Sequence, residues 1–272
     1  MTIKKKNETV KQARKEHSEL IELLLKNIKT KLKVEFNRAQ RAAITEYREK
    51  RYINNDIWEA HQEKLYEISY IGFNKSLKAG YLRLMKTFVK ANWTKKDNID
   101  KFLTDLKQNF EEFAHIQATK SARAMLKTTK KTVDWLLEKY QESEKNAKEF
   151  NDFEAFIKKV MDEAKDRSVS RAVISGLSII HGGINKGAEE GAELTIKNEQ
   201  ITNINKFWVT MQDNAVRDSH VLTHGQAVAH DLKFLVPDLK NGGTDSMRYP
   251  GDRDASIGNW INCRCTKLYR RD

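Results

Sequence analysis

The residue types with the clearest chemistry are two cysteines and two histidines in the C-terminal part of the chain. Cys263 and Cys265 are separated by one residue, and His220 and His224 are one helical turn apart. Two thiolates and two imidazoles form a ligand set that suits tetrahedral zinc. The sequence therefore predicts a structural metal site with His220, Cys263 and Cys265 as ligands and His224 or Asp213 as the fourth. A pair of buried free thiols, with the histidines bonded to backbone groups, is the alternative.

A catalytic role for such a metal would need an open coordination position and a general base. Asp213 is the candidate base, which gives the hypothesis of a metal-dependent hydrolase or nuclease built on Asp213, His220 and the two cysteines. Only closeness in sequence supports this, and we expect that the protein is not an enzyme. Asp213 and Arg217 have the spacing of an ion pair across one helical turn. Arg264 is expected to point away from the cysteines if its segment is a strand.

Short strands and turns are expected to position these side chains. Three runs have strand character: residues 208–211, 232–236 and 260–269. Two segments have the residues of turns: 241–244 and 249–252. We therefore expect residues 201–272 to form a small α+β module. A module of this size buries little apolar surface, so a bound metal would stabilise it.

The first part of the chain has the pattern of long helices. Residues 1–236 contain no proline, as a mostly helical region requires. Apolar residues recur at helical spacing, as in the series Ile21, Leu24, Leu25, Ile28 and Leu32, the series Phe73, Leu77, Tyr81, Leu84 and Phe88, and the series Phe153, Phe156, Ile157, Val160 and Met161. We expect five or six helices in a mainly α region over residues 1–200. Helix starts are expected near Asn54, at Thr94 and at Asn151 or Asp152, with a polar turn or exposed helical segment at 142–148.

Three glycines interrupt the helical pattern at a regular spacing. Gly183, Gly187 and Gly191 lie four residues apart and would share one face of a helix. Glycine costs about 1 kcal/mol relative to alanine inside a helix, so three of them need a reason. Either another backbone approaches this face closely, or the segment is a hinge before the C-terminal module.

The excess of basic residues indicates which kinds of partner the protein could bind. The formal net charge is +12, of which +10 falls on residues 1–202. Such an excess favours nucleic acid or an acidic protein surface, although a solvated lysine-rich helical surface has the same composition. The N-terminus lacks the apolar run of a signal peptide, and no apolar stretch is long enough to span a membrane. Two cysteines do not make a disulfide scaffold, so we expect a protein made in a reducing cytoplasm, with no membrane partner.

Taken together, the C-terminal motifs form an ordered series that covers about residues 207–265. Its members are Trp208, Asp213, Arg217, His220, Gly225, Tyr249, Pro250, Gly251, Asp252, Asn262, Cys263, Arg264 and Cys265. This series resembles the head-morphogenesis family of tailed phages, typified by the F protein of phage Mu and related minor head proteins encoded beside the portal gene. A long helical N-terminal part is also usual in that family.

The resemblance implies a minor head protein rather than an enzyme. Such proteins associate with the portal and assist capsid assembly, DNA packaging or DNA delivery. The implied partners are the portal, the capsid and scaffold proteins, and packaged double-stranded DNA bound without sequence preference. The implied location is the virion, inside the capsid near the portal, after assembly in the host cytoplasm. A stand-alone non-specific DNA-binding protein is a further alternative.

Overall fold

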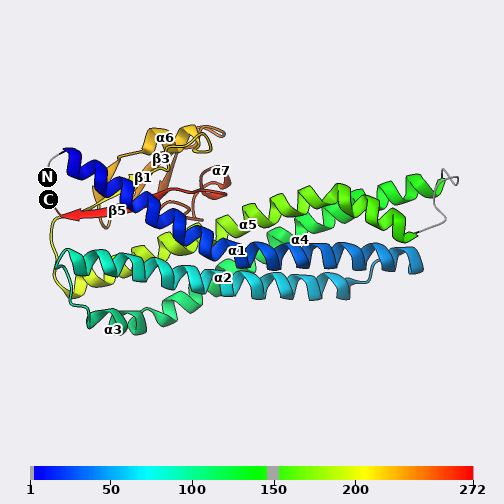
Figure 1. Cartoon of the computed structure of the whole chain (residues 1–272), viewed down its shortest axis with the longest axis horizontal. Coiled ribbons are helices and arrows are strands. Elements are labelled where there is room, and N and C mark those ends of the chain that lie inside the picture. The colour runs from blue at the N-terminus through cyan, green and yellow to red at the C-terminus, as the bar shows by residue number, and fades with distance from the viewer. Residues whose placement is uncertain (1–2, 146–152, 272) are drawn as a thin grey trace. The chain divides into compact units, whose positions relative to one another are not determined.

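The computed structural model describes residues 3–145 and 153–271, with side chains described for residues 9–142, 158 and 168–271. Long α-helices come first and a small module of short antiparallel strands follows, which confirms the predicted fold class (Figure 1). The helices before residue 200 are α1 (Ile3–Lys50), α2 (Asn55–Lys90), α3 (Asn98–Asp105), α4 (Lys107–Lys145) and α5 (Phe153–Asn198). The described part of residues 1–200 contains no strand. Among the described helices, none has an apolar run that would cross a membrane.

The chain divides into two compact units, each assembled from separate segments. Unit 1 comprises Met1–Leu25, Gly72–Ala114 and Leu177–Asp272, and unit 2 comprises Lys26–Ile71 and His115–Gly176. Secondary structure changes at the end of α5, close to the expected boundary at residue 200. The strand-containing module nevertheless belongs to the same unit as α3 and parts of the long helices.

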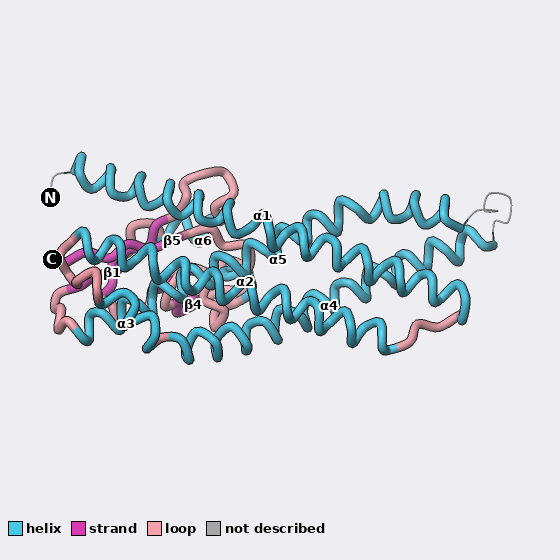
Figure 2. Tube along the Cα trace, turned by 60° about the horizontal axis from the view of Figure 1, so that its bottom comes forward, coloured by secondary structure: helices cyan, strands magenta, loops and turns pink. Residues whose placement is uncertain are grey.

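Within unit 1, α2 and α5 are in direct backbone contact and lie side by side in Figures 1 and 2. A Cβ atom on Gly187 would lie 2.0 Å from the carbonyl oxygen of Leu77, and one on Gly80 would lie 2.0 Å from that of Ile184. On Gly183 it would lie 2.5 Å from the Cβ of Ser76. The glycine spacing therefore marks a close approach of two helices. The hinge alternative is wrong, since α5 continues unbroken through these glycines.

The C-terminal module contains a three-stranded and a two-stranded antiparallel sheet. Its elements are β1 (Ile204–Val209), α6 (Asp218–Thr223), β2 (Ala227–Ala229), β3 (Phe234–Pro237), β4 (Thr244–Met247), α7 (Ile257–Trp260) and β5 (Thr266–Arg271). The strand orders are β2-β1-β5 and β3-β4, and Trp208 of β1 lies opposite Lys267 of β5. The module core contains Trp208, Phe234, Val236, Met247, Cys263 and Cys265.

The three predicted strands exist, each with changed bounds, and the second runs over Phe234–Pro237 instead of 232–236. The first begins earlier than expected and ends at Val209, and the last begins only at Thr266. Residues 260–265 were expected to be part of that last strand and are not, because α7 includes Trp260 and Asn262 adopts a left-handed backbone conformation (φ 52°). An extended strand cannot pass through that conformation.

Both predicted turns are confirmed. At 241–244 a hairpin joins β3 to β4, and Gly242 and Gly243 both have positive φ. At 249–252 the amide of Asp252 donates to the carbonyl of Tyr249 at 3.1 Å, and the φ of Gly251 is +81°. Proline at the second position and a positive-φ glycine at the third are the requirements of a type II turn.

The expected helix starts have mixed outcomes. Asn54 caps α2, because its Oδ1 accepts a hydrogen bond from the Asp56 amide at 3.2 Å. Thr94 does not cap a helix, since its hydroxyl donates to Glu199 and α3 begins only after Asp97. α4 continues through Lys145, and residues 146–152, with the caps expected at 151 or 152, lie outside the described residues.

Unit 2 contains an apolar core cluster and a buried polar chain centred on His61. Ala43, Trp58 and Val133 form a core cluster. The Nδ1 of His61 lies 2.7 Å from the Glu35 carboxylate, and its Nε2 lies 3.1 Å from the Thr129 hydroxyl. Burial alone would raise the pKa of Glu35, but hydrogen bonds from His61 and Arg38 outweigh it and lower that pKa.

Candidate metal centre

His220, Cys263 and Cys265 converge in the core of the C-terminal module. The Nδ1 of His220 lies 3.4 Å from the sulfur of Cys265 and 3.8 Å from that of Cys263, and each residue is 1% exposed. Zinc–ligand bonds of about 2.3 Å to sulfur and 2.0–2.1 Å to nitrogen place the N and S atoms of a tetrahedron about 3.6 Å apart. The three ligand atoms lie within 4.8 Å of one another, so this group can hold a metal ion. The predicted cluster is confirmed in its geometry.

The short helix α6 presents His220 to the cysteines and is fastened to their segment by Arg217. This arginine precedes α6, and its guanidinium donates to the carbonyl of Ile261, two residues before Cys263. The expected ion pair between Asp213 and Arg217 is wrong, because Asp213 pairs instead with Arg264. The reason is local, since residues 213–216 form a turn rather than a helix, with the Ala215 amide bonded to the Asp213 carboxylate.

Asn262 sets the direction of the cysteine segment. Its positive φ is a conformation in which asparagine is enriched and most residues are disfavoured. The backbone N–H of Asn262 donates to the Ser178 hydroxyl of α5 at 3.0 Å. After this bend Cys263 and Cys265 are buried while the side chain of Arg264 is 30% exposed. Arg264 thus differs from both cysteines in exposure, as expected, although the segment is not a strand.

An aromatic side chain and a glycine shape the other side of the group. The indole of Trp208 is fully buried and lies edge-on to the His220 ring, with centroids 5.3 Å apart. The amide of Gly225 donates to the Trp208 carbonyl at 2.9 Å, and its φ is +81°. The side chain of Gln226 then bonds the backbone of Leu235 in β3. Gly225 and Gln226 therefore connect β1 and α6 to β3.

The two thiols differ in acidity. Burial alone opposes ionisation of Cys263, but hydrogen bonds from Cys265 and His220 outweigh it and hold the pKa of Cys263 well below its usual range. The hydrogen bond to Cys263, together with burial, raises the pKa of Cys265. The pair therefore favours one thiolate, and a divalent cation between the sulfurs would favour two.

The two residues considered as a fourth ligand lie elsewhere. The Nδ1 of His224 accepts a hydrogen bond from the Thr210 amide at 3.2 Å, and the side chain of Asp213 is 46% exposed beside Arg264. Burial, with a contribution from Arg14, lowers the pKa of His224. Neither residue belongs to the group of converging ligand atoms. The Tyr249–Asp252 turn has a different role, since Asp252 accepts hydrogen bonds from the backbone and side chain of Arg248.

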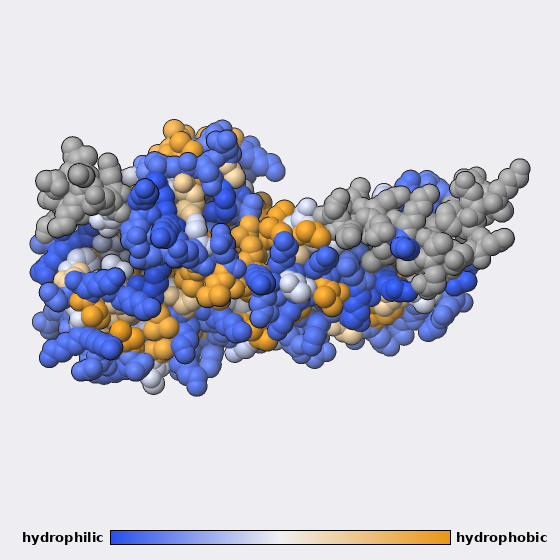
Figure 3. Space-filling view, viewed as in Figure 1, coloured by the Kyte–Doolittle hydropathy of each residue, from blue (hydrophilic) through white to orange (hydrophobic). Residues whose placement is uncertain are grey.

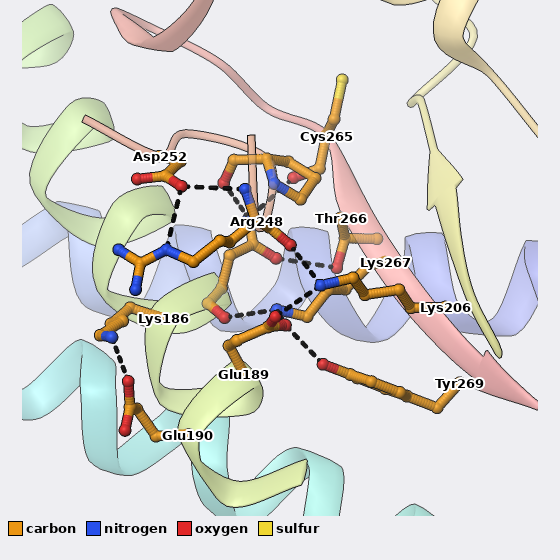
Figure 4. A network of polar contacts seen from close by, with 12 residues as sticks. Lys186, Glu189, Glu190, Lys206, Arg248, Asp252, Cys265, Thr266, Lys267 and Tyr269 are labelled. Atoms are coloured by element: carbon orange, nitrogen blue, oxygen red, sulfur yellow. Dashed lines mark hydrogen bonds and ion pairs between the residues drawn. The ribbon is translucent and has the colours of Figure 1, made fainter. Parts of the chain in front are cut away.

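A second buried polar centre was not predicted from the sequence (Figure 4). The carboxylate of Glu189 lies 2.7 Å from Nζ of Lys206 and 2.6 Å from Nζ of Lys267, and it accepts a hydrogen bond from the Tyr269 hydroxyl at 2.6 Å. The ammonium of Lys206 also donates to the Arg248 carbonyl and that of Lys267 to the Asn185 carbonyl. This network, which we call the Glu189 network, consists of Glu189, Lys206, Lys267 and Tyr269.

The Glu189 network joins α5 to both long strands of the module. Burial alone would raise the pKa of Glu189, but the charges of Lys267 and Lys206 outweigh it and lower that pKa. Burial lowers the pKa of Lys267 to about 8 despite its contact with Glu189. One turn earlier, the Asn185 side chain donates to the carbonyls of Pro250 and Cys265. Figure 4 shows the side chain of Cys265 directed away from this network.

Two further buried histidines were also missed from the sequence. His17 of α1 and His181 of α5 are 0% and 1% exposed, and the Nε2 of His17 lies 3.2 Å from the Nδ1 of His181. Burial lowers the pKa of His181 to about 4, while the nearby Cys263 acts in the opposite direction. Both histidines lie in apolar helical patterns, where nothing in the sequence distinguishes them from core residues.

Comparisons with protein-family models, with curated proteins and with solved structures found no match to this chain.

Proposed function

We propose that this protein is a tailed-phage minor head protein with a structural metal centre in its C-terminal module. The observation that carries the proposal is the convergence of the motif residues of the series. Trp208, His220, Cys263 and Cys265 share one core, although they are spread over the sequence. Gly225, Gly251 and Asn262 all occupy positive-φ positions that suit glycine or asparagine. The series is thus accounted for as the framework of one small module.

Zinc is the ion that we propose for the centre. Two thiolates and an imidazole at these separations suit zinc, and a small module gains stability from such a ligand. A structural role is favoured over a metal-dependent hydrolase or nuclease, because the three ligands are 1% exposed and no substrate could reach them. Asp213, the base of the hydrolase hypothesis, is paired with Arg264 outside the group.

For partners, we propose the portal protein first and packaged DNA second, inside the capsid near the portal. The net charge of +12 supports the DNA contact through phosphate neutralisation. Hydrophilic residues dominate much of the face in Figure 3. Lys90, Lys95 and Lys96 are exposed at the end of α2 and the segment after it. Apolar side chains are exposed too, including Val221 and Leu222 of α6, and these suit a protein surface such as the portal.

The test is coexpression of the intact chain with the portal protein of the same genome, followed by affinity purification at low and high salt. We expect the portal to copurify at both salt concentrations. DNA binding should be independent of sequence and fall about 10³–10⁵-fold between 50 and 200 mM salt if six to ten phosphates are contacted.

Charge reversal at three exposed lysines tests the DNA contact separately. The combined variant Lys90→Glu, Lys95→Glu and Lys96→Glu should weaken DNA binding and reduce its salt dependence. Lys64→Glu is the control, because Lys64 is already paired with Glu67 at 2.5 Å. Sequence-selective DNA binding that is insensitive to salt, without portal association, would indicate a DNA regulator and refute the head-protein proposal.

A further inference from the structure

Within unit 2, helix α4 has two faces of opposite character. One face is buried, where Val133 belongs to the core cluster and the Thr129 hydroxyl lies 3.1 Å from the Nε2 of His61. The other face is exposed and carries four cations at intervals of three or four residues, which places them in one row along the helix. The cations, which we call the α4 row, are Lys120, Arg123, Lys127 and Lys131.

The α4 row lies in a segment without acidic residues. Residues 113–133 contain five lysines and arginines and no aspartate or glutamate. In neighbouring segments, exposed lysines pair with a glutamate one turn away, as Lys107 does with Glu111 and Lys139 with Glu142. Among the described side chains, no cation of the α4 row is in an ion pair. Like charges one turn apart destabilise a helix, so a row that keeps four of them favours an anionic ligand that neutralises them.

The side chains exposed between these cations are small. Ala124 and Thr128 are exposed within the row, and the Thr128 hydroxyl donates to the Ala124 carbonyl at 2.9 Å. From Lys120 to Lys131, a stretch that the structure describes in full, no large apolar side chain is exposed. Protein interfaces are usually anchored by aromatic or apolar side chains at their centre. A row of cations without such an anchor suits a nucleic-acid backbone better than a protein surface.

We propose that the α4 row binds the phosphate backbone of double-stranded DNA. This inference rests on the proposed function, in which packaged DNA is a partner. It gives unit 2 a DNA-binding surface of its own, separate from Lys90, Lys95 and Lys96 of unit 1. From Lys120 to Lys131 the helix rises about 16 Å, and duplex DNA carries one phosphate charge per about 1.7 Å of its axis. Each cation of the row can therefore meet a phosphate.

Salt-dependent DNA binding by the intact protein tests the α4 row. The probe is a DNA duplex of random sequence, titrated between about 50 and 200 mM salt. The combined variant Arg123→Gln, Lys127→Gln and Lys131→Gln removes three phosphate contacts and keeps good helix formers. Its slope of log affinity against log salt should be about 2.7 smaller than that of the wild-type protein, so its affinity falls about 40-fold less over this range.

The matched control removes the same charge from paired lysines. It is the combined variant Lys64→Gln, Lys107→Gln and Lys139→Gln, in which each lysine is exposed and pairs with a glutamate. Its slope should equal that of the wild-type protein. Circular dichroism spectra of the three proteins should coincide, because all six substituted side chains are exposed.

Equal slopes for the two combined variants would overturn the assignment of the α4 row and leave the DNA contact of the proposed function intact. Wild-type protein that does not bind the duplex would overturn both. Polyglutamate is the second probe, because it has the charge of an acidic protein surface without phosphates. If it displaces the labelled duplex as well as unlabelled DNA of equal charge does, the α4 row is a site for an acidic protein, and its assignment to DNA is overturned.

Discussion

The two buried polar centres of unit 1 differ in how far their polar atoms are satisfied. In the Glu189 network both lysine ammoniums and both carboxylate oxygens have partners at 2.6–3.0 Å. In the candidate metal centre the Nδ1 of His220 contacts both thiols, and the Nε2 of His220 is buried without a hydrogen-bond partner among the described residues. Buried polar groups are normally paired, and exceptions call for an explanation. The charged groups of the first centre are all paired. The second centre has two thiols and one imidazole nitrogen facing one another, which is the composition of a site that a metal ion would complete.

The largest expected effect is at Glu189. Glu189→Ala leaves two buried lysines without their carboxylate, which should lower the free energy of unfolding by about 3–5 kcal/mol. Glu67→Ala is the control, because Glu67 and Lys64 are about half exposed, and such pairs contribute about 0–1 kcal/mol. Urea unfolding followed by circular dichroism measures both. Equal losses in the two variants would mean that the Glu189 network does not fasten α5 to the module.

Zinc binding at the metal centre should have the next largest effect on the stability of the protein. At a free zinc concentration 100 times the dissociation constant, binding adds about 2.7 kcal/mol to the stability of the folded state. Thermal denaturation with zinc and with a chelator measures this difference. Cys263→Ser should abolish it, and His224→Ala should retain it, because His224 bonds the Thr210 amide instead. If the melting temperature of the wild-type protein is the same with zinc and with a chelator, the second centre does not bind zinc, and the proposed difference between the two centres is refuted.

The third effect concerns the contact that holds α5, which carries Glu189 and His181, against α2. Gly187→Ala would place a methyl group 2.0 Å from the Leu77 carbonyl oxygen, so we expect a loss of about 1–3 kcal/mol through overpacking. Gly182→Ala is the matched control on the same helix, since its methyl group would meet only the Gly251 oxygen at 3.6 Å. It should be neutral or gain up to about 1 kcal/mol from helix propensity. Comparable unfolding free energies for the two variants would contradict the close contact.

The sequence was informative where chemistry is local or periodic. The absence of proline and the apolar stripes predicted long helices. The glycine spacing left two alternatives, a close helix contact or a hinge, and the structure has the close contact. The cysteine pair and His220 were predicted together because their residue types suit one ion. These inferences need only residue type and spacing, and the long helices and the cluster of His220 with the two cysteines are present in the structure.

The unpredicted part consists of contacts between distant segments. Glu189 meets Lys206 and Lys267 from two different strands, and in the sequence all three resemble residues of a solvated surface. Asp213 was assigned to Arg217 because helical spacing was assumed, and a turn gave it Arg264 instead. His181 was overlooked because α5 looks like an ordinary packed helix at that point. Only the arrangement of the segments reveals these partners.

The smallest effect is a pH dependence of stability that arises at Lys267 of the Glu189 network. Burial lowers the folded-state pKa of Lys267 from 10.5 to about 8, so in the folded protein this lysine releases its proton first. Between these values the unfolded state binds more protons, and stability should rise with pH by at most about 1.4 kcal/mol per pH unit.

The groups facing the Lys267 ammonium are Glu189, Glu193, Lys206, Tyr249 and Tyr269. Burial raises the pKa of both tyrosines, which lowers stability above about pH 10. Urea unfolding between pH 8 and 9.5 measures the slope. Because Cys263 and Cys265 also have shifted pKa values, only the difference in slope between variants is assigned to the lysine. Lys267→Met should flatten the slope, whereas Lys186→Met, which removes a lysine paired with Glu190 at the edge of the network, should leave it. A slope that persists in Lys267→Met would assign the titration to another group and leave the Glu189 network without a role in it.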